Sequence, residues 1–136
     1  MILGIGIDAV TIDRFAQWHL KPRRSLRKLF SDAEIEYCVS VPARSAERFA
    51  VRYAAREAFF KALQAMQHAQ DHAFAFPFLR IARSIAVVRQ ESGMPLCVVD
   101  WECLGVSVAL QPRVHLSLTH TESIAQALVI LESQER

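Results

Sequence analysis

Two carboxylates that lie far apart in the sequence are the residues best suited to chemistry. Asp8 ends the apolar stretch 4–8, and Glu57 is the one carboxylate in a helix-like stretch, 48–62, that carries four cations. Carboxylate oxygens are preferred ligands of hard cations such as Mg²⁺, and neighbouring cations suit a polyphosphate. If the fold brings Asp8 and Glu57 together, the combination indicates phosphoryl chemistry that depends on Mg²⁺.

Both carboxylates also have a plainer interpretation. Asp is a preferred residue at helix N-termini, so Asp8 could cap the segment that follows it. Glu57 and Lys61 are four residues apart, and such neighbours on a helix form ordinary salt bridges that contribute about 0.3–0.5 kcal/mol. The residues alone leave both alternatives open.

Further donors for a phosphate come from two other segments. Arg48, Arg52 and Arg56 fall four residues apart and therefore lie along one ridge of a helix. Residues 117–121 place hydroxyl groups and the imidazole of His120 at a polar tip between two apolar segments. These groups could bind phosphate oxygens, or they could form a capped turn with a solvated histidine.

Composition limits the classes of protein to which the chain can belong. Its 136 residues favour a single domain, 1–136, and with 52% hydrophobic residues it can bury a core. The net charge of +2 does not indicate a nucleic-acid partner. The apolar N-terminal run stops at Asp8, and no apolar stretch reaches the roughly 18–20 residues of a membrane span. We therefore expect a cytoplasmic protein that binds neither nucleic acid nor membrane.

Several common sites are missing from the sequence. There is no P-loop, no complete Gly-x-Gly-x-x-Gly before a helix, no Gly-x-Ser-x-Gly and no His-Glu-x-x-His. Their absence argues against zinc and serine-hydrolase chemistry. The cysteines are odd in number and match no zinc or disulfide spacing, which predicts reduced, buried thiols at Cys38, Cys97 and Cys103.

The elements that must position these residues begin with a strand. Residues 2–10 are mostly small or β-branched and apolar, which predicts a buried strand in which Gly4 and Gly6 allow close approach of another backbone. Ser31 and Glu34 form a capping-box pattern, so a helix is expected to start there.

The longest periodic segment, 43–69, contains mostly good helix formers and no Gly or Pro, which predicts one long helix. The segments that follow alternate short apolar runs with turn residues. We expect short helices at 11–20 and 102–110, a loop at 71–77, and strands at 78–82, 85–89, 96–101, 114–118 and 124–131. One strand, then helices, then consecutive strands favour an α+β fold whose mainly antiparallel sheet packs against the long helix.

A basic run, 21–28, contains five cations and no acid. Most such runs are solvated faces, but a surface of this charge could also dock an acidic partner. Eight residues do not decide between the two.

Four sequence blocks together resemble the holo-acyl-carrier-protein synthases, the single-domain group of the 4′-phosphopantetheinyl transferases. The blocks occur in the family's order and span almost the whole chain: 4–8 with Arg14 and Phe15, Phe30 and Ser31 with Glu34, 48–62, and 115–121 with the apolar segment 125–132. Gly93-x-Pro95 fits as well. Any one block is weak evidence, whereas four in order are strong.

The resemblance implies a 4′-phosphopantetheinyl transferase-like fold and a Mg²⁺-dependent activity. Such an enzyme transfers phosphopantetheine from coenzyme A to a serine of apo-acyl carrier protein, leaving adenosine 3′,5′-bisphosphate, in support of fatty acid biosynthesis. The family's single-domain members assemble as homotrimers with sites between subunits. We therefore expect Asp8 and Glu57 to lie at an interface.

The resemblance also assigns catalytic roles by position. Asp8 and Glu57 match the family's metal ligands, and Lys61 matches a lysine that contacts phosphate. These three are the expected catalytic residues. Glu57, directly or through a metal-bound water, is the candidate base that takes the proton of the serine.

The resemblance also implies which residues bind coenzyme A and the carrier protein. Arg52, His120 and Thr121 match positions that contact the phosphates of coenzyme A, together with Lys61. Arg14 and the basic run after it match the helix that receives the acidic carrier protein. Docking is therefore expected at Arg14, Lys21, Arg24 and Arg27.

The chain departs from the family's pattern at two places. Arg56 stands where the family usually has lysine, and these residues are not interchangeable at a phosphate. The family's Gly-rich turn after Lys61 and Ala62 is absent, so 63–67 should continue the helix and alter the wall of the coenzyme pocket. Two other hypotheses remain: a module that binds coenzyme A or an acidic partner without turnover, and a purely structural α+β domain.

Overall fold

The computed structural model describes residues 1–71 and 76–134. In chain order the α-helices and strands are β1 (Ile2–Thr11), α1 (Arg23–Leu26), α2 (Asp32–Val39), α3 (Ser45–Ala69), α4 (Phe78–Arg83), β2 (Ile85–Arg89), β3 (Pro95–Val99), β4 (Arg113–His120) and β5 (Ile124–Glu132). Short 3₁₀ turns occur at Ile12–Phe15, Trp18–Leu20, Pro42–Arg44 and Val108–Leu110.

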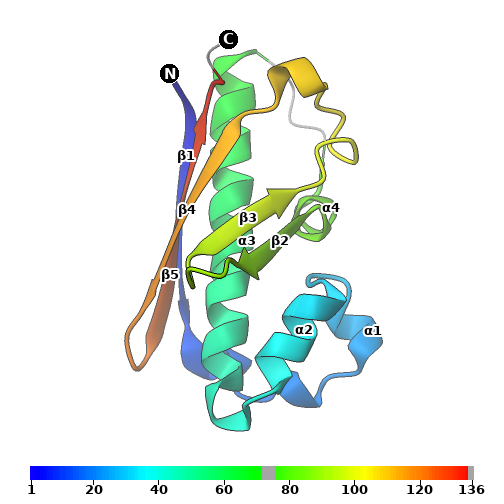
Figure 1. The fold of residues 1–136 in the computed structure, drawn as a ribbon, viewed down its shortest axis with the longest axis vertical. Coiled ribbons are helices and arrows are strands. Elements are labelled where there is room, and N and C mark those ends of the chain that lie inside the picture. The colour runs from blue at the N-terminus through cyan, green and yellow to red at the C-terminus, as the bar shows by residue number, and fades with distance from the viewer. Residues whose placement is uncertain (72–75, 135–136) are drawn as a thin grey trace.

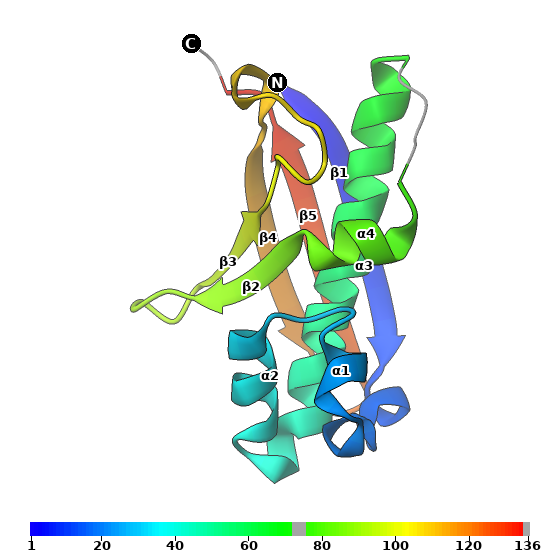
Figure 2. The ribbon, with the colours of Figure 1, turned by 90° about the vertical axis from the view of Figure 1, so that its right-hand side faces the viewer.

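A three-stranded antiparallel sheet with strand order β1-β5-β4 packs along one side of the long helix α3 (Figure 1). β2 and β3 form a separate antiparallel hairpin, which projects to one side of the sheet and helix in the turned view (Figure 2). α1 and α2 lie near the end of α3 that is opposite the chain termini (Figure 1). The predicted α+β fold, with a mainly antiparallel sheet and a long packed helix, is confirmed.

The core lies between the sheet and α3. Alternate residues of β5 point to this core, and its inward positions are all buried: Ala125, Ala127, Val129 and Leu131. α3 contributes Phe49, Phe59 and Leu63, each with at most 1% of its surface exposed. Small alanines on the same helix let the sheet approach closely.

Gly4 and Gly6 set the distance between β1 and α3. A Cβ atom on Gly6 would lie 1.8 Å from the carbonyl oxygen of Ala58, and one on Gly4 would lie 2.1 Å from that of Ala62. Only glycine fits such contacts, as the sequence predicted. Because residues 4, 6 and 8 of a strand share one face, Asp8 continues this row toward the preceding turns of α3.

Two expected elements differ in the structure. Residues 78–82, expected as a strand, belong to helix α4, because Phe78, Ile81 and Ala82 have a spacing that also suits a helix and Ile81 and Ala82 bury their side chains. Residues 102–110, expected as a helix, form turns with one 3₁₀ turn. Gly105 has a φ of +66°, which a continuous helix does not allow.

Smaller differences occur elsewhere. Residues 11–20 form two 3₁₀ turns rather than an α-helix, and residues 72–75 of the expected loop 71–77 lie outside the described residues.

Cys38 and Cys97 are buried, and burial raises the pKa of both thiols to about 12. Cys103 is exposed, contrary to the prediction, and its thiol donates a 3.1 Å hydrogen bond to Asp100. None of the helices described here could cross a membrane.

Candidate active site

Asp8 lies in the middle of β1, opposite Ala127 of β5, so it does not cap a helix. The Nζ atom of Lys61 donates hydrogen bonds to Oδ1 of Asp8 and to the carbonyl oxygen of Ile7, both at 3.0 Å. The side chain of Asp8 is 15% exposed, and its Oδ2 atom is buried without a hydrogen-bond partner. Such an oxygen is costly to leave unpaired and is a ready ligand for a cation.

Glu57 does not form the helical salt bridge with Lys61 that its plainer interpretation predicted, because Lys61 pairs with Asp8 instead. The hydroxyl of Tyr53 donates a 3.2 Å hydrogen bond to Oε1 of Glu57 and accepts one of 3.2 Å from Arg14. Burial is the main cause of a raised pKa for Tyr53, so its hydroxyl keeps its proton at neutral pH. Because Lys61 lies one turn after Glu57, its bond to Asp8 brings both carboxylates to the same side of α3.

The donor set fits a hard cation that keeps other ligands. Asp8 and Glu57 each have a carboxylate oxygen that receives no hydrogen bond in the described part of the chain. No cluster of three or more His, Cys, Asp or Glu ligands occurs within residues 1–71 and 76–134. Mg²⁺ is typically bound by one or two carboxylates, with waters and substrate phosphates completing its shell.

A cationic pocket of about 300 Å³ lies between the N-terminal half of α3, the end of β4 and the β2–β3 hairpin. Its basic lining consists of Arg44, Arg48, Arg52, Arg89 and His120. Glu47 is the one carboxylate among the lining residues. This excess of positive charge suits a ligand with several phosphate groups.

Tyr37 organises the arginines of this pocket. The guanidinium groups of Arg48 and Arg52 lie 4.0 and 4.5 Å from the centre of its ring, and Arg89 donates a 2.8 Å hydrogen bond to its hydroxyl. Arg52 is only 5% exposed, and its Nε atom is buried without a partner, as is that of Arg48. Both arginines therefore retain a donor that no group in the described chain satisfies.

The positions of His120 and Thr121 agree with both interpretations of residues 117–121, the capped turn and the phosphate-binding site. Thr121 Oγ1 accepts hydrogen bonds from the backbone N–H groups of Ser123 and Ile124, which confirms the capped turn. His120 lines the cationic pocket, and its Nε2 atom lies 3.2 Å from Oε1 of Glu47.

The chain separates the carboxylates from the cationic pocket. Residues of an α-helix are about 100° apart, so Arg52 and Lys61, nine positions apart, lie on opposite sides of α3. β1 and β4, which carry Asp8 and His120, form the two edges of the sheet. The pocket is lined by none of Asp8, Glu57 and Lys61. One chain thus presents two separate groups of candidate site residues, Asp8, Glu57 and Lys61 on one side of α3 and the cationic pocket on the other. We call these groups the two half-sites.

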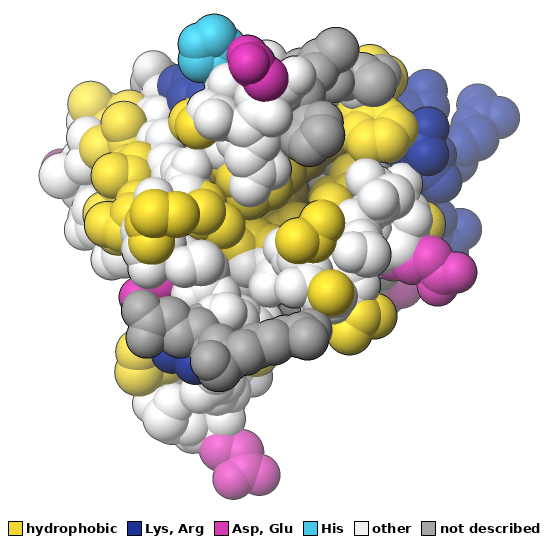
Figure 3. Space-filling model, turned by 90° about the horizontal axis from the view of Figure 1, so that it is seen from above, with side chains coloured by type: hydrophobic (Ala, Val, Ile, Leu, Met, Phe, Trp, Pro, Cys, Tyr) yellow, Lys and Arg dark blue, Asp and Glu magenta, His cyan; other side chains and the backbone are white. Residues whose placement is uncertain are grey.

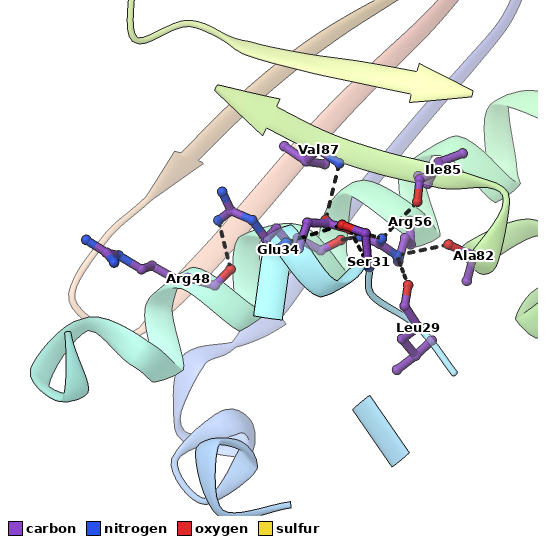
Figure 4. A network of polar contacts seen from close by, with 9 residues as sticks. Leu29, Ser31, Glu34, Arg48, Arg56, Ala82, Ile85 and Val87 are labelled. Atoms are coloured by element: carbon purple, nitrogen blue, oxygen red, sulfur yellow. Dashed lines mark hydrogen bonds and ion pairs between the residues drawn. The ribbon is translucent and has the colours of Figure 1, made fainter. Parts of the chain in front are cut away.

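Arg56 occupies neither half-site, although a contact with phosphate was considered for it. It is fully buried and forms a bidentate ion pair with Glu34, with N–O distances of 2.6 and 2.9 Å (Figure 4). It also donates to four backbone carbonyl oxygens, which belong to Leu29, Arg52, Ala82 and Ile85. The arginine therefore joins α3 to the segments before α2 and around β2.

The structure confirms the predicted capping box of Ser31 and Glu34. Glu34 also has partners outside this capping box. Its Oε2 atom also accepts a hydrogen bond from the backbone N–H of Val87. Burial alone would raise the pKa of this carboxyl, but the charge and hydrogen bonds of Arg56, with those of Ser31 and Val87, hold it below its usual value. The ion pair fixes β2, which borders the cationic pocket, against α2 and α3.

The expected docking residues all lie on the surface: Arg14 in the first 3₁₀ turn, Lys21 just after the second, Arg24 in α1 and Arg27 just after it. Arg27 forms a 2.7 Å ion pair with Asp32, and Lys21 lies 5.3 Å from the ring centre of Trp18. Arg24 forms no ion pair with any described residue. Arg14 differs from the other three docking residues because its hydrogen bond to Tyr53 connects it to Glu57.

Exposed apolar residues of the described chain gather at several places, among them the outer face of the sheet, the β2–β3 hairpin and the end with both termini. The outer face of the sheet carries Ile5, Ile7 and Leu128, which are 52%, 60% and 37% exposed. At the end with both termini, hydrophobic side chains surround a shallow hollow (Figure 3). Patches of this kind often mark contacts with other chains.

Comparison with known proteins places this fold and site in a family. The model of the 4′-phosphopantetheinyl transferase superfamily matches residues 4–100. The chain is similar to a holo-[acyl-carrier-protein] synthase of Treponema denticola, with 36% identity over 137 residues that cover 97% of this chain and 99% of that protein. The corresponding protein of Koribacter versatilis is 39% identical over 134 residues, with the same coverage.

Solved structures agree with the sequence relatives. An ACPS–coenzyme A complex from Chronobacterium ammoniagenes superposes with a TM-score of 0.76 at 26% identity, covering 97% of this chain and 98% of that one. A holo-(acyl-carrier-protein) synthase from Bacillus anthracis in complex with CoA (3′,5′-ADP) has a TM-score of 0.70 at 27% identity, covering 98% and 99%. The α+β fold is thus that of the acyl-carrier-protein synthases. The chain belongs to the 4′-phosphopantetheinyl transferase superfamily, and the resemblance stated from its sequence is confirmed.

Proposed function

We propose that this chain transfers the 4′-phosphopantetheine group from coenzyme A to a serine of apo-acyl carrier protein, in support of fatty acid biosynthesis. The products are holo-acyl carrier protein and adenosine 3′,5′-bisphosphate. The observation that carries the proposal is the pairing of Asp8 with Lys61 beside Glu57, in a chain whose relatives are holo-[acyl-carrier-protein] synthases. Its location in the cytoplasm stays a prediction.

Asp8 and Glu57 are the proposed ligands of Mg²⁺. The unpaired, buried Oδ2 atom of Asp8 supports this assignment, because a bound cation would satisfy it. When bound, Mg²⁺ would neutralise negative charge on the pyrophosphate of coenzyme A.

Lys61 and Glu57 have distinct tasks in the transfer. The ammonium group of a lysine has three donors, and Ile7 and Asp8 use two of those of Lys61, so one remains for a phosphate oxygen. The hydrogen bonds to Ile7 and Asp8 hold the charged ammonium group of Lys61 beside the reacting phosphate. The attacking serine must lose its proton, and Glu57 is the carboxylate proposed to receive it.

The cationic pocket is the proposed site for the remaining phosphates of coenzyme A. Arg52 and His120 line it, and the unsatisfied Nε atom of Arg52 supports phosphate binding. Thr121 follows at the hairpin turn, where its hydroxyl already accepts two backbone hydrogen bonds and could donate its own proton.

The exposed cations of the N-terminal turns and α1 are the proposed docking surface for acyl carrier protein. An acidic partner would find Arg24 without an ion pair to any described residue, and Arg27 paired with the exposed carboxylate of Asp32. Ion pairs this exposed contribute little, so exchange for a partner's carboxylates costs little. The proposed docking residues remain Arg14, Lys21, Arg24 and Arg27.

A homotrimer with sites between subunits is the proposed assembly. Two observations support it: one chain keeps its two half-sites apart, and the outer face of its sheet exposes Ile5, Ile7 and Leu128. A neighbouring copy placed against that face would bury them and could bring its cationic pocket to Asp8 and Glu57. The assembly would then complete one site at each interface.

Replacing Glu57 tests the proposed function. Glu57→Gln removes the charge of a metal ligand with little change in size, so phosphopantetheine transfer should fall below detection while the circular dichroism spectrum stays unchanged. Transfer is measured as the intact mass of the carrier protein. Glu102→Gln, an exposed change in a turn, is the matched control and should keep full activity. Near-normal transfer by Glu57→Gln would refute the metal-site assignment.

A further inference from the structure

Tyr53 lies between two groups to which the proposed function gives separate tasks. It precedes Glu57 by one turn of α3, and its hydroxyl donates to Oε1 of Glu57 at 3.2 Å. The same hydroxyl accepts a hydrogen bond from Nη2 of Arg14, also at 3.2 Å. Arg14 belongs to the exposed basic surface, whereas Glu57 belongs to the pair of carboxylates. Within residues 1–71 and 76–134, this hydroxyl is the one group that hydrogen-bonds to both.

The ring of Tyr53 is held on several sides, which fixes where its hydroxyl can be. Its centre lies 5.4 Å from that of Phe15, 5.9 Å from that of Trp18 and 6.0 Å from that of Phe78. The guanidinium carbon of Arg14 lies 4.7 Å from the same ring centre. Aromatic contacts of this kind restrict the ring without using its polar atom. The hydroxyl is thus preorganised for its hydrogen bonds.

A half-buried glutamate without a fixed partner would sample several side-chain rotamers. The hydrogen bond from Tyr53 restrains Oε1 of Glu57, and its other oxygen, Oε2, receives no hydrogen bond from the described residues. Partners that orient a ligand in this way typically change metal affinity or activity by about 10–100-fold when they are removed. The same hydroxyl is polarised by the positive charge of Arg14, which strengthens its donation to the carboxylate.

We propose that Tyr53 is a positioning residue that orients Glu57 for its cation and links it to Arg14 on the carrier-docking surface. This inference rests on the proposed function, because it assigns the cation to Glu57 and the docking role to Arg14. An acidic carrier protein that engages Arg14 would weaken the bond from Arg14 to Tyr53. The position of Glu57 would then respond to docking.

Tyr53→Phe tests the positioning role because it removes the hydroxyl and keeps the ring. Mn²⁺ binding is measured by electron paramagnetic resonance with saturating coenzyme A and no carrier protein, so that no turnover occurs. We expect Mn²⁺ affinity to fall about tenfold and kcat to fall with it, while KM for coenzyme A stays within about twofold. Mn²⁺ affinity within twofold of the wild type would overturn the proposal.

Ser84→Ala is the control for metal affinity. It also removes one side-chain hydroxyl and its hydrogen bond, to the carbonyl oxygen of Arg80, but Ser84 belongs to neither half-site. Its Mn²⁺ affinity should equal that of the wild type. An equal loss in both variants would mean that the effect does not come from the contact with Glu57, and it would overturn the proposal.

A double-mutant cycle tests the link to Arg14. Arg14→Gln should weaken Mn²⁺ binding about threefold in the wild type and have no further effect beside Tyr53→Phe, because the influence passes through the hydroxyl. Additive losses would refute the link. The Mn²⁺ data do not depend on transfer, so a wild type that binds Mn²⁺ but modifies no carrier protein would refute the proposed function alone.

Discussion

Buried charge beside the site is the main feature at the scale of single residues. Arg56 precedes Glu57 in the sequence, yet it points into the core and pairs with Glu34. Its three remaining N–H donors bond to four backbone carbonyl oxygens, so the pair stabilises one arrangement of α2, α3 and β2. Removing one partner from a buried ion pair leaves the other charge uncompensated, which typically costs about 3–5 kcal/mol.

Glu34→Gln should therefore lower the free energy of unfolding by about 3 kcal/mol, measured by urea denaturation. Asp32→Asn, in the same turn of α2, removes the exposed ion pair with Arg27 and should cost less than about 1 kcal/mol. Equal losses in the two variants would contradict the role given to the buried pair.

The pair also predicts how stability depends on acid. Because the pKa of Glu34 is lower in the folded chain than its ordinary value of 4.5, its contribution is present above that pH. The contribution is lost as the pH falls through the folded pKa. The wild type should thus lose stability between neutral pH and pH 3 more steeply than Glu34→Gln does. Parallel curves would contradict this assignment.

At the scale of elements, the approach of β1 to α3 places Asp8. The row Gly4, Gly6 and Asp8 lies on one face of the strand, and the first two allow backbone contact with α3. The bond of Lys61 to Ile7 and Asp8 ties the same two elements together. The geometry of the carboxylate pair therefore depends on the absence of two side chains.

Gly6→Ala tests this dependence. Its Cβ atom would meet the backbone of Ala58 at 1.8 Å, so the strand must move away from the helix. Overpacking of this kind costs about 1–3 kcal/mol, and we expect both the free energy of unfolding and the affinity for Mn²⁺ to fall. Ala9→Ser, on the opposite face of β1, is the control. A variant with unchanged stability and Mn²⁺ affinity would show that the contact is not required.

Elements with a clear period were predictable from sequence, and short ones were not. The helix 43–69 and the strands that became β1 and β5 have long, regular apolar patterns. The segment 78–82 is too short for its spacing to separate helix from strand, and it became α4 because tertiary contacts bury Ile81 and Ala82.

The candidate site was predictable to a similar extent. The residue types of Asp8, Glu57 and Lys61 pointed to their chemistry. Their pairing depends on the register between β1 and α3, which no local pattern encodes. Tyr53 is not among the predicted site residues, since nothing in the sequence shows that its hydroxyl meets Arg14 and Glu57.

At the scale of the whole molecule, the two half-sites on one chain favour an assembly that completes them. Glu57→Gln and His120→Ala damage different half-sites, so each variant alone should have impaired transfer. In trimers formed by co-expression of both, about one interface in four should combine two undamaged halves. We expect transfer to recover to about that fraction. Activity equal to the average of the two separate variants would place each complete site within one chain.

Transfer itself is the most direct test of the account. Apo-acyl carrier protein is incubated with this protein, coenzyme A and Mg²⁺, with a parallel sample in EDTA, and its intact mass is measured. We predict a mass gain equal to one phosphopantetheine that appears only with Mg²⁺. No gain, with coenzyme A still bound, would contradict the central claim and indicate a binding module instead.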